Sequence, residues 1–150
     1  MSGDGRLVRI AETEAEVRSC FPLMKQLRPH LLSEDEFVTR WARQLKDGYR
    51  LMMLLAGESG KEQVVAVAGY RVQENLVYGR FLYVDDLVSD EGARGSGFGA
   101  QLMDSLKLET KVQGCGKLVL DTALSNSLAQ RFYFRNGLLA TAMRFNFAVA

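Results

Sequence analysis

Residues 83–99 read YVDDLVSDEGARGSGFG. Within this stretch the sequence changes from a strand pattern to a helix pattern, and that change decides the fold. The first part of the stretch continues an apolar run typical of a buried strand, but two adjacent carboxylates, Asp85 and Asp86, interrupt the run. The glycines that follow Arg94 end the extended segment and lead into an amphipathic helix. A strand, a glycine-rich loop and a helix in this order predict a binding loop beside a chemical site.

The segment before residue 50 predicts one strand and two helices. LVRI at 7–10 has the composition of an opening strand. Thr13 caps a helix whose apolar positions recur at helical spacing up to Leu27. Ser33 caps a second amphipathic helix, and Gly48 ends it.

After residue 49 the apolar period changes from helical to strand-like, which predicts an antiparallel meander. We therefore expect an α+β fold with a mixed sheet in the order β-α-α-β-β-β-α-β-α-β. The later elements are predicted as strands at 50–58, 63–72 and 78–89, a helix at 96–112, a strand at 117–122, a helix at 125–137 and a last strand at 138–149.

The composition predicts a single globular domain over residues 1–150. The chain is 47% hydrophobic and carries a formal net charge of +1, with basic residues scattered along it, which disfavours nucleic acid and membrane surfaces as partners. MSGDGRLVRI lacks the apolar run of a signal peptide, and a cytoplasmic protein is expected. Cys20 and Cys115 are isolated and His30 is the one histidine, so two buried free thiols and no metal site are predicted.

The glycine-rich loop is a candidate anion site. At a helix N-terminus, unpaired backbone N–H groups and the helix dipole favour a phosphate, and glycines let the backbone approach it closely. Arg94 adds charge-assisted hydrogen bonds. The spacing matches neither a Walker A loop nor a dinucleotide fingerprint. A tight turn that binds nothing is the alternative.

The loop resembles the signature of the GCN5-related N-acetyltransferases, Arg/Gln-x-x-Gly-x-Gly/Ala, in which Arg94, Gly97 and Gly99 fill the defined places. The order of strands and helices is similar to that family's over nearly the whole chain. NSLAQRFYFRNGL at 126–138 also looks like the family's Asn-x-x-Ala-x-x-Phe-Tyr-x-x-x-Gly-Phe segment, although Leu138 replaces the usual Phe.

The resemblance implies acetyl-CoA as the acyl donor. In the family the loop amides hold the pyrophosphate, and backbone groups at the end of the fourth strand, where it splays from the fifth, bond the pantetheine. Ser89 departs from the apolar residue usual at its place, but the contact is through backbone. The residues implied to bind the cosubstrate are Leu87, Val88, Ser89, Arg94, Gly95, Ser96, Gly97, Phe98, Gly99, Ala100, Asn126 and Tyr133. Capping of the last helix alone would also explain Asn126.

The two carboxylates are candidate catalytic groups. Strand alternation places Asp85 on one face and Asp86 on the other, unless a bulge intervenes, and each breaks an apolar pattern. Pairing with arginines or backbone amides is the structural alternative. Spermidine/spermine acetyltransferases carry a Glu-Asp pair at the same distance before the arginine, which favours Asp85 as base.

Amine acetylation needs that base because an alkyl amine titrates near ~10.4, so only about one molecule in a few thousand is neutral at pH 7. Asp85 would accept the proton directly or through a water. A backbone N–H near Leu87 would stabilise the oxyanion, and the resemblance makes Tyr133 the candidate acid. A tyrosine packed on the core through its ring is the alternative for Tyr133.

The acceptor is predicted to be a small-molecule amine, a polyamine or an amino sugar, because paired acids attract a cationic amine. Acetylation of a protein amine, a longer acyl chain and a non-catalytic acyl-CoA-binding module remain alternatives, and a homodimer is possible. The segments that supply acceptor contacts in the family offer side chains without a common motif: Arg28, His30, Tyr49, Tyr70 and Tyr78.

Overall fold

The computed structural model describes residues 5–93 and 95–150. They form two compact units, one reaching to Val119 and the other from Leu120 to Ala150. The elements are β1 (Arg6–Ile10), α1 (Glu14–Ser19), α2 (Phe21–Leu27), α3 (Glu34–Leu45), β2 (Arg50–Ala56), β3 (Gln63–Asn75), β4 (Gly79–Ser89), the 3-10 turn η1 (Glu91–Ala93), α4 (Phe98–Val112), β5 (Lys117–Leu120) and α5 (Ser127–Arg135).

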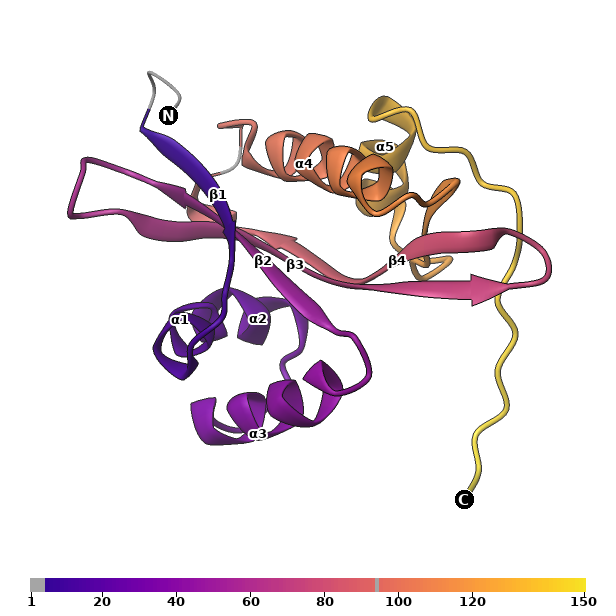
Figure 1. Cartoon of the computed structure of the whole chain (residues 1–150), viewed down its shortest axis with the longest axis horizontal. Coiled ribbons are helices and arrows are strands. Elements are labelled where there is room, and N and C mark those ends of the chain that lie inside the picture. The colour runs from indigo at the N-terminus through magenta and orange to yellow at the C-terminus, as the bar shows by residue number, and fades with distance from the viewer. Residues whose placement is uncertain (1–4, 94) are drawn as a thin grey trace. The chain divides into compact units, whose positions relative to one another are not determined.

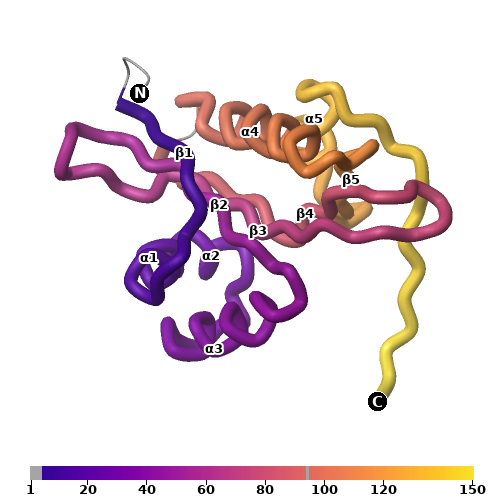
Figure 2. The backbone as a smooth tube through the Cα atoms, in the orientation of Figure 1, coloured from indigo at the N-terminus to yellow at the C-terminus, as the bar shows by residue number. Residues whose placement is uncertain are grey.

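The five strands make one sheet in the order β1-β2-β3-β4-β5. The first four pair antiparallel, as the alternating apolar runs predict, and the chain path through them can be followed in Figure 2. β5 returns to the edge next to β4 after the helix α4, which is the crossover connection expected of a mixed sheet. The predicted α+β class is confirmed.

Helices cover both faces of the β1–β4 sheet. α1, α2 and α3 pack on one face and α4 on the other (Figure 1). On the first face Val17, Met24 and Trp41 join the sheet residues in one buried core. On the other face Leu102 and Leu106 of α4 are fully buried, as the helical spacing predicts.

The predicted first helix is wrong in one respect, because it is two helices. α1 begins after Thr13, whose side chain accepts a hydrogen bond from the Glu16 amide in a capping box, and ends at Ser19. α2 begins at Phe21 with Pro22 in its first turn. A proline has no N–H to donate to the residue four positions before it, so the helix stops and a new one starts where that donor is not needed.

The predicted last strand at 138–149 is also wrong. These residues form no strand and no helix. Their alternating apolar side chains are exposed, with Phe145 at 84% and Phe147 at 90%. A strand exists only where a neighbouring strand takes up its N–H and C=O groups, and the described residues of the second unit contain no such neighbour within that unit.

Both cysteines are free thiols, as predicted, but the prediction that both are buried is wrong for Cys115. Cys20 is fully buried, whereas Cys115 is partly exposed. Burial raises the pKa of the Cys20 thiol to about 12, which keeps it protonated at neutral pH. In the native protein at pH 8 we expect a thiol reagent to modify Cys115 fast and Cys20 only after denaturant is added. Mass mapping of the modified peptides measures this, and equal rates at both positions would contradict the buried environment of Cys20.

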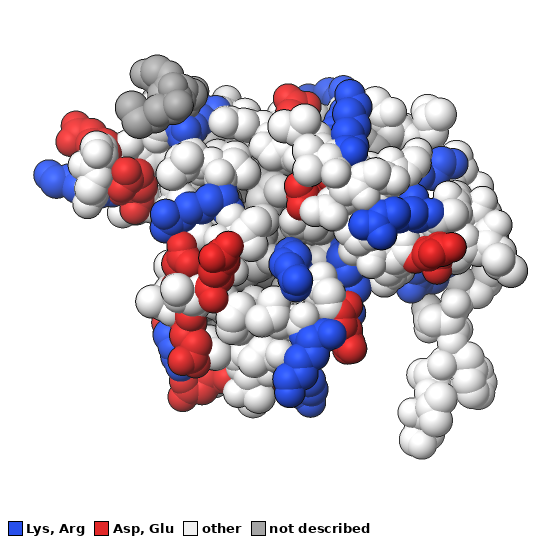
Figure 3. Space-filling view, viewed as in Figure 1, with Lys and Arg blue, Asp and Glu red and all other residues white. Residues whose placement is uncertain are grey.

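Helix length and the distribution of surface charge bear on contacts with membranes and nucleic acids. Across the part of the chain that the structure describes, the helices are too short or too polar to cross a bilayer. On the face that Figure 3 shows, basic side chains lie scattered among acidic and uncharged ones rather than in one continuous patch.

Candidate active site

A bulge in β4 brings the two carboxylates to the same face of the sheet. Gly69 pairs with Asp86 and Tyr70 pairs with Val84, so Asp85 is an extra residue between two regular pairs. Asp86 contacts Arg28 at the end of α2, and Asp85 contacts Arg71, which also bonds to α3, so both side chains lie on the face that α2 and α3 cover. The expectation that they lie on opposite faces is therefore wrong, and the bulge is the reason, because an extra residue shifts the alternation by one position.

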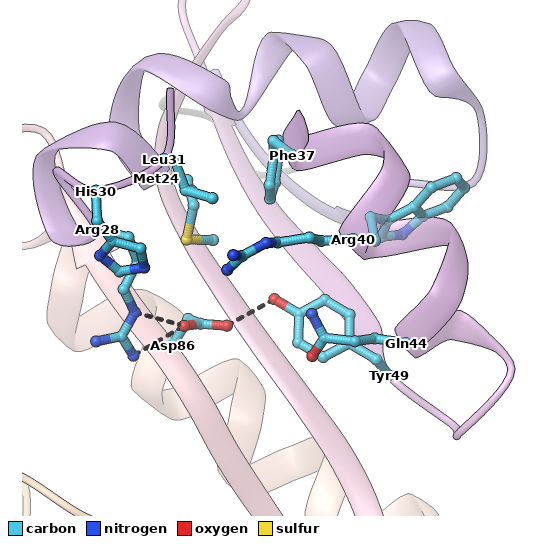
Figure 4. A pocket seen from close by; sticks show the side chains of 10 residues that line it. Met24, Arg28, His30, Leu31, Phe37, Arg40, Gln44, Tyr49 and Asp86 are labelled. Atoms are coloured by element: carbon cyan, nitrogen blue, oxygen red, sulfur yellow. Dashed lines mark hydrogen bonds and ion pairs between the residues drawn. The ribbon is translucent and has the colours of Figure 1, made fainter. Parts of the chain in front are cut away.

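Asp86 is held by two hydrogen bonds and an ion pair. Its Oδ1 accepts from Nε of Arg28 at 3.0 Å and forms an ion pair with Nη2 at 2.9 Å, while its Oδ2 accepts from the Tyr49 hydroxyl at 2.7 Å (Figure 4). Nη2 of Arg28 also donates to the Asp85 carbonyl at 2.9 Å. Its side chain is 15% exposed. A buried carboxylate with partners at both oxygens holds the side chains around it in place. The alternative that Asp86 has a structural role through pairing with an arginine therefore fits well.

Tyr49 lies against the sheet because Gly69 leaves space for it. Tyr49 is 3% exposed, and a Cβ added to Gly69 would lie 1.9 Å from its hydroxyl oxygen. Burial, reinforced by the charge of Asp86, raises the pKa of Tyr49 well above its ordinary value. The phenol therefore keeps its proton and stays a hydrogen-bond donor to Asp86.

Asp85 pairs with a different arginine. Its Oδ2 accepts from Nε of Arg71 at 3.0 Å, and Nη2 of the same arginine donates to Gln44 of α3 at 2.6 Å. Burial raises the pKa of Asp85, and Arg71 opposes that shift. A carboxylate with a raised pKa and one oxygen outside the ion pair is better suited to accept a proton than Asp86, both of whose oxygens are engaged.

Arg71 was not among the residues that the sequence singled out. It lies in β3 immediately after Tyr70, where the apolar pattern of a buried strand breaks. A cation at that point could have indicated a partner for the neighbouring acids, because an arginine in a buried strand needs a carboxylate nearby.

The acceptor candidates separate into two groups. Arg28, His30 and Tyr49 line one cavity next to Asp86. Tyr70 lies on the opposite face of the sheet and donates to Glu109 of α4 at 2.7 Å, and Tyr78 packs its ring against Phe81. The latter two tyrosines thus lie outside this cavity.

The end of β4 extends beyond its neighbour β5. Gly116, just before β5, donates to the Arg80 carbonyl at the start of β4. Since a strand advances roughly 3.3 Å per residue, the four residues of β5 reach only the first half of β4. Along the second half, Leu87 and Val88 pair with β3 on one side and lie beyond the reach of β5 on the other.

The glycine loop leads into α4 with the geometry of an anion site. Gly95 and Gly97 have φ of +89° and +78°, and Gly97 caps α4. A Cβ added to either glycine meets nothing within 4 Å, so the loop faces open space and the glycines are needed for backbone conformation. The first-turn amides of α4, including those of Phe98, Gly99 and Ala100, have no partner inside the helix. Arg94 lies outside the described residues.

Arg6 of β1 fixes this loop, which the sequence did not indicate. Its guanidinium donates to the Ser96 carbonyl at 2.9 Å and to the Gln101 side chain at 2.8 Å, and it stacks on the Phe98 ring. Arg6 is far from the loop in sequence, yet its hydrogen bond to the loop backbone holds the N–H groups of the loop in place.

The chain matches the model of the acetyltransferase (GNAT) family over residues 11–138. The chain belongs to the GNAT acetyltransferase family. It is therefore an acyltransferase by family, and the predicted resemblance is confirmed. The match includes β4 with its two aspartates, the glycine loop and the segment 126–138.

Curated and solved GNAT proteins are similar over most of their length. Glucosamine 6-phosphate N-acetyltransferase 1 of Oryza sativa subsp. japonica is 29% identical over 124 residues, which cover 79% of this chain and 75% of that protein. Glucosamine-6-phosphate N-acetyltransferase of Arabidopsis thaliana superposes with a TM-score of 0.73 at 22% identity, with 97% and 99% of the two chains covered.

A further solved structure, of AAC(6')-Iy with a bisubstrate analogue made from CoA and acetylneamine, has a TM-score of 0.82 at 16% identity, with 97% of this chain and 98% of the other covered. At such identities the two solved structures show a shared fold. GNAT neighbours of this chain thus include one solved with a CoA-derived ligand.

The second GNAT segment supplies α5, which is described within its own unit. The Asn126 side chain accepts from the Ala129 amide at 3.1 Å, which is the capping role that was the alternative for this residue. Tyr133 is partly buried, and its ring lies edge-on to Phe132 with centroids 5.6 Å apart.

Proposed function

We propose that this GNAT protein transfers the acetyl group of acetyl-CoA to the primary amine of a small molecule. The observation that carries the proposal is the arrangement along β4. The strand β4 carries the Asp85 carboxylate at its bulge, and the backbone groups that follow lie beyond the reach of β5. The chain then leads to the start of α4, which Gly97 caps. These are an acceptor for a proton, a strand edge and an anion site in sequence.

The donor would be held by backbone. The amides of residues 95–100 suit a pyrophosphate, since Gly95 and Gly97 turn the chain without filling the space above it. The uncovered groups of Leu87, Val88 and Ser89 suit the amides of pantetheine, which would add to β4 as a further strand. When bound, acetyl-CoA supplies an acetyl thioester.

Side chains and backbone groups of this chain would then accept the amine proton, stabilise the oxyanion and protonate the departing thiolate. Asp85 accepts the proton of the amine, and Asp86 keeps Arg28 and Tyr49 in place beside it. The Leu87 amide is the proposed donor to the oxyanion, and Tyr133 the proposed acid for the departing thiolate. Because a thiol has a pKa of about 8.5, protonating the thiolate lowers the barrier by only ~2 kcal/mol at neutral pH.

The relatives guide the choice of acceptors to test. Two of them are named for glucosamine 6-phosphate and one was solved with an acetylated aminoglycoside fragment. We propose an amino sugar or a similar small amine as acceptor. A homodimer and a cytoplasmic location stay predictions.

Titration calorimetry with CoA and acetyl-CoA, followed by CoA release with a panel of amines, tests the proposal. A protein that binds neither nucleotide would refute it. Binding without transfer to any amine would instead support the non-catalytic module.

A Gly97→Glu variant is expected to lose most of its affinity for CoA, at least roughly 100-fold, because a carboxylate at the loop repels phosphate and φ of +78° disfavours a side chain. Calorimetry measures the change. Gly60→Glu is the matched control, since Gly60 has φ of +83° and its Cβ would also meet open space, but it lies in a turn away from α4. Normal CoA binding by a folded Gly97→Glu protein would contradict the phosphate site.

A further inference from the structure

The cavity beside Asp86 is large enough for a ligand group. It lies between α2, α3 and β4, and its volume is about 120 Å³. One water needs roughly 10–15 Å³ of such space, so the cavity holds several waters or one group of the size of a phosphate. Met24, Leu31 and Phe37 form its apolar wall, and the polar side chains converge on the opposite side (Figure 4).

The acids at this site are already neutralised. Arg28 pairs with Asp86 and Arg71 pairs with Asp85, each at hydrogen-bond distance. The cavity is lined by two arginines, Arg28 and Arg40, and by one carboxylate. The excess charge on its wall is therefore positive, which disfavours a polycation in this cavity.

Arg40 is the arginine of the cavity wall that pairs with neither Asp85 nor Asp86. It extends from α3 toward the space between Met24 and Asp86 (Figure 4). Within the described part of the chain its one ion pair is with Glu36, at 3.5 Å, which is longer than an N–H···O hydrogen bond. Glu36 in turn accepts from the Leu32 amide with its other oxygen. The guanidinium donors of Arg40 are thus available to a ligand.

Two further side chains that carry N–H groups line the same cavity. His30 follows α2 and lies beside Arg28 in the view of Figure 4. Trp41 is 7% exposed, and among residues 5–93 and 95–150 its buried Nε1–H finds no acceptor. A wall rich in N–H donors, with its one carboxylate already paired, is complementary to oxygen atoms that carry negative charge.

We infer that the acceptor amine carries an anionic group, such as a phosphate, and that Arg40 binds this group in the cavity with His30 beside it. The inference rests on the proposed function and narrows its substrate. A phosphorylated amino sugar fits the site better than the same sugar without phosphate, and a polycationic aminoglycoside fits least, since it would meet Arg40 with like charge.

Trp41 allows binding to be measured without catalysis, because it is the one tryptophan of the chain and it lines the cavity. Inorganic phosphate is expected to change its fluorescence saturably, and sodium chloride at equal ionic strength is not. In an Arg40→Gln variant the phosphate concentration at half-saturation should rise roughly 10- to 100-fold, as expected for loss of a hydrogen bond between two charged groups. A response to phosphate that Arg40→Gln leaves unchanged would overturn the inference.

Kinetics test the same site with acceptors. Glucosamine 6-phosphate should have a kcat/KM at least roughly tenfold above that of glucosamine, and Arg40→Gln should remove this preference by raising KM with little change in kcat. Arg43→Gln is the matched control, because Arg43 is exposed on the same helix and does not line the cavity. A kcat/KM for glucosamine or neamine equal to or above that of the phosphate ester would overturn the inference.

The two proposals fail in different ways. If neither CoA nor acetyl-CoA binds, the acetyltransferase proposal fails, while the fluorescence titration still decides whether the cavity is an anion site. If acetyl transfer proceeds with unphosphorylated amines only, the acetyltransferase proposal holds and the anion site is refuted.

Discussion

An Asp85→Asn variant is expected to lose roughly 10²- to 10⁴-fold in kcat/KM at neutral pH, which is the range for removal of a general base. The amide keeps the size of the carboxylate and can still accept a hydrogen bond from Arg71, so the strand and its bulge should persist. What disappears is the capacity to take a proton from an ammonium group. CoA release with a saturating acetyl donor measures the loss.

The pH dependence identifies the reason for that loss. In the native protein, burial raises the pKa of Asp85, so the acidic limb of the kcat/KM profile should lie above the range of an ordinary aspartate. In Asp85→Asn the amine must lose its proton to solvent, and the rate should rise about tenfold per pH unit toward the amine pKa near ~10.4.

Asp104→Asn is the control for the Asp85 variant, since Asp104 is exposed on α4 and should be neutral to activity. Asp85→Asn activity equal to that of the native protein, with the same pH profile, would eliminate Asp85 as the base.

A Gly69→Ala variant is expected to lower the free energy of unfolding by roughly 3 to 5 kcal/mol, through overpacking and the loss of a hydrogen bond to a charged group. The new Cβ would lie 1.9 Å from the Tyr49 hydroxyl and 2.7 Å from Oδ2 of Asp86. Both groups are held by neighbours, so the hydroxyl must leave the carboxylate. Chemical denaturation measures the change.

Two controls isolate the contact at Gly69. Gly116→Ala should change stability little, because a Cβ there meets nothing within 4 Å. In a Tyr49→Ala background, the cost of Gly69→Ala should fall well below its cost in the native protein, because the side chain it strikes is absent. Additive effects of the two substitutions would show that the close contact is not the cause.

The sequence predicted the elements whose signals are local. Thr13 and Ser33 cap helices as their type and position indicate, and the α4 residues at helical spacing are buried. The family resemblance came from two short segments, and the match over residues 11–138 confirms it.

The remaining features depend on contacts between distant parts of the chain. The bulge at Asp85 is visible only once β3 is aligned with β4, because alternation within one strand cannot reveal an extra residue. Arg28 meets Asp86 from the end of α2, and Arg71 meets Asp85 from the neighbouring strand β3. Arg6 reaches the glycine loop from β1. The strand pattern at 138–149 indicated what those side chains favour, but a strand also requires a neighbour, which no local pattern specifies.

Because of the bulge, the residue proposed as the base in β4 is not one of the residues that pair with β3. Deleting Asp85 would leave Val84 opposite Tyr70 and Asp86 opposite Gly69, a regular ladder with every flanking pair retained. The acid that the proposed reaction uses thus occupies a position that the β3–β4 ladder does not require, and its contacts are those with Arg28 and Arg71. Deletion of this one residue would then remove the proposed base and its activity while the fold is retained.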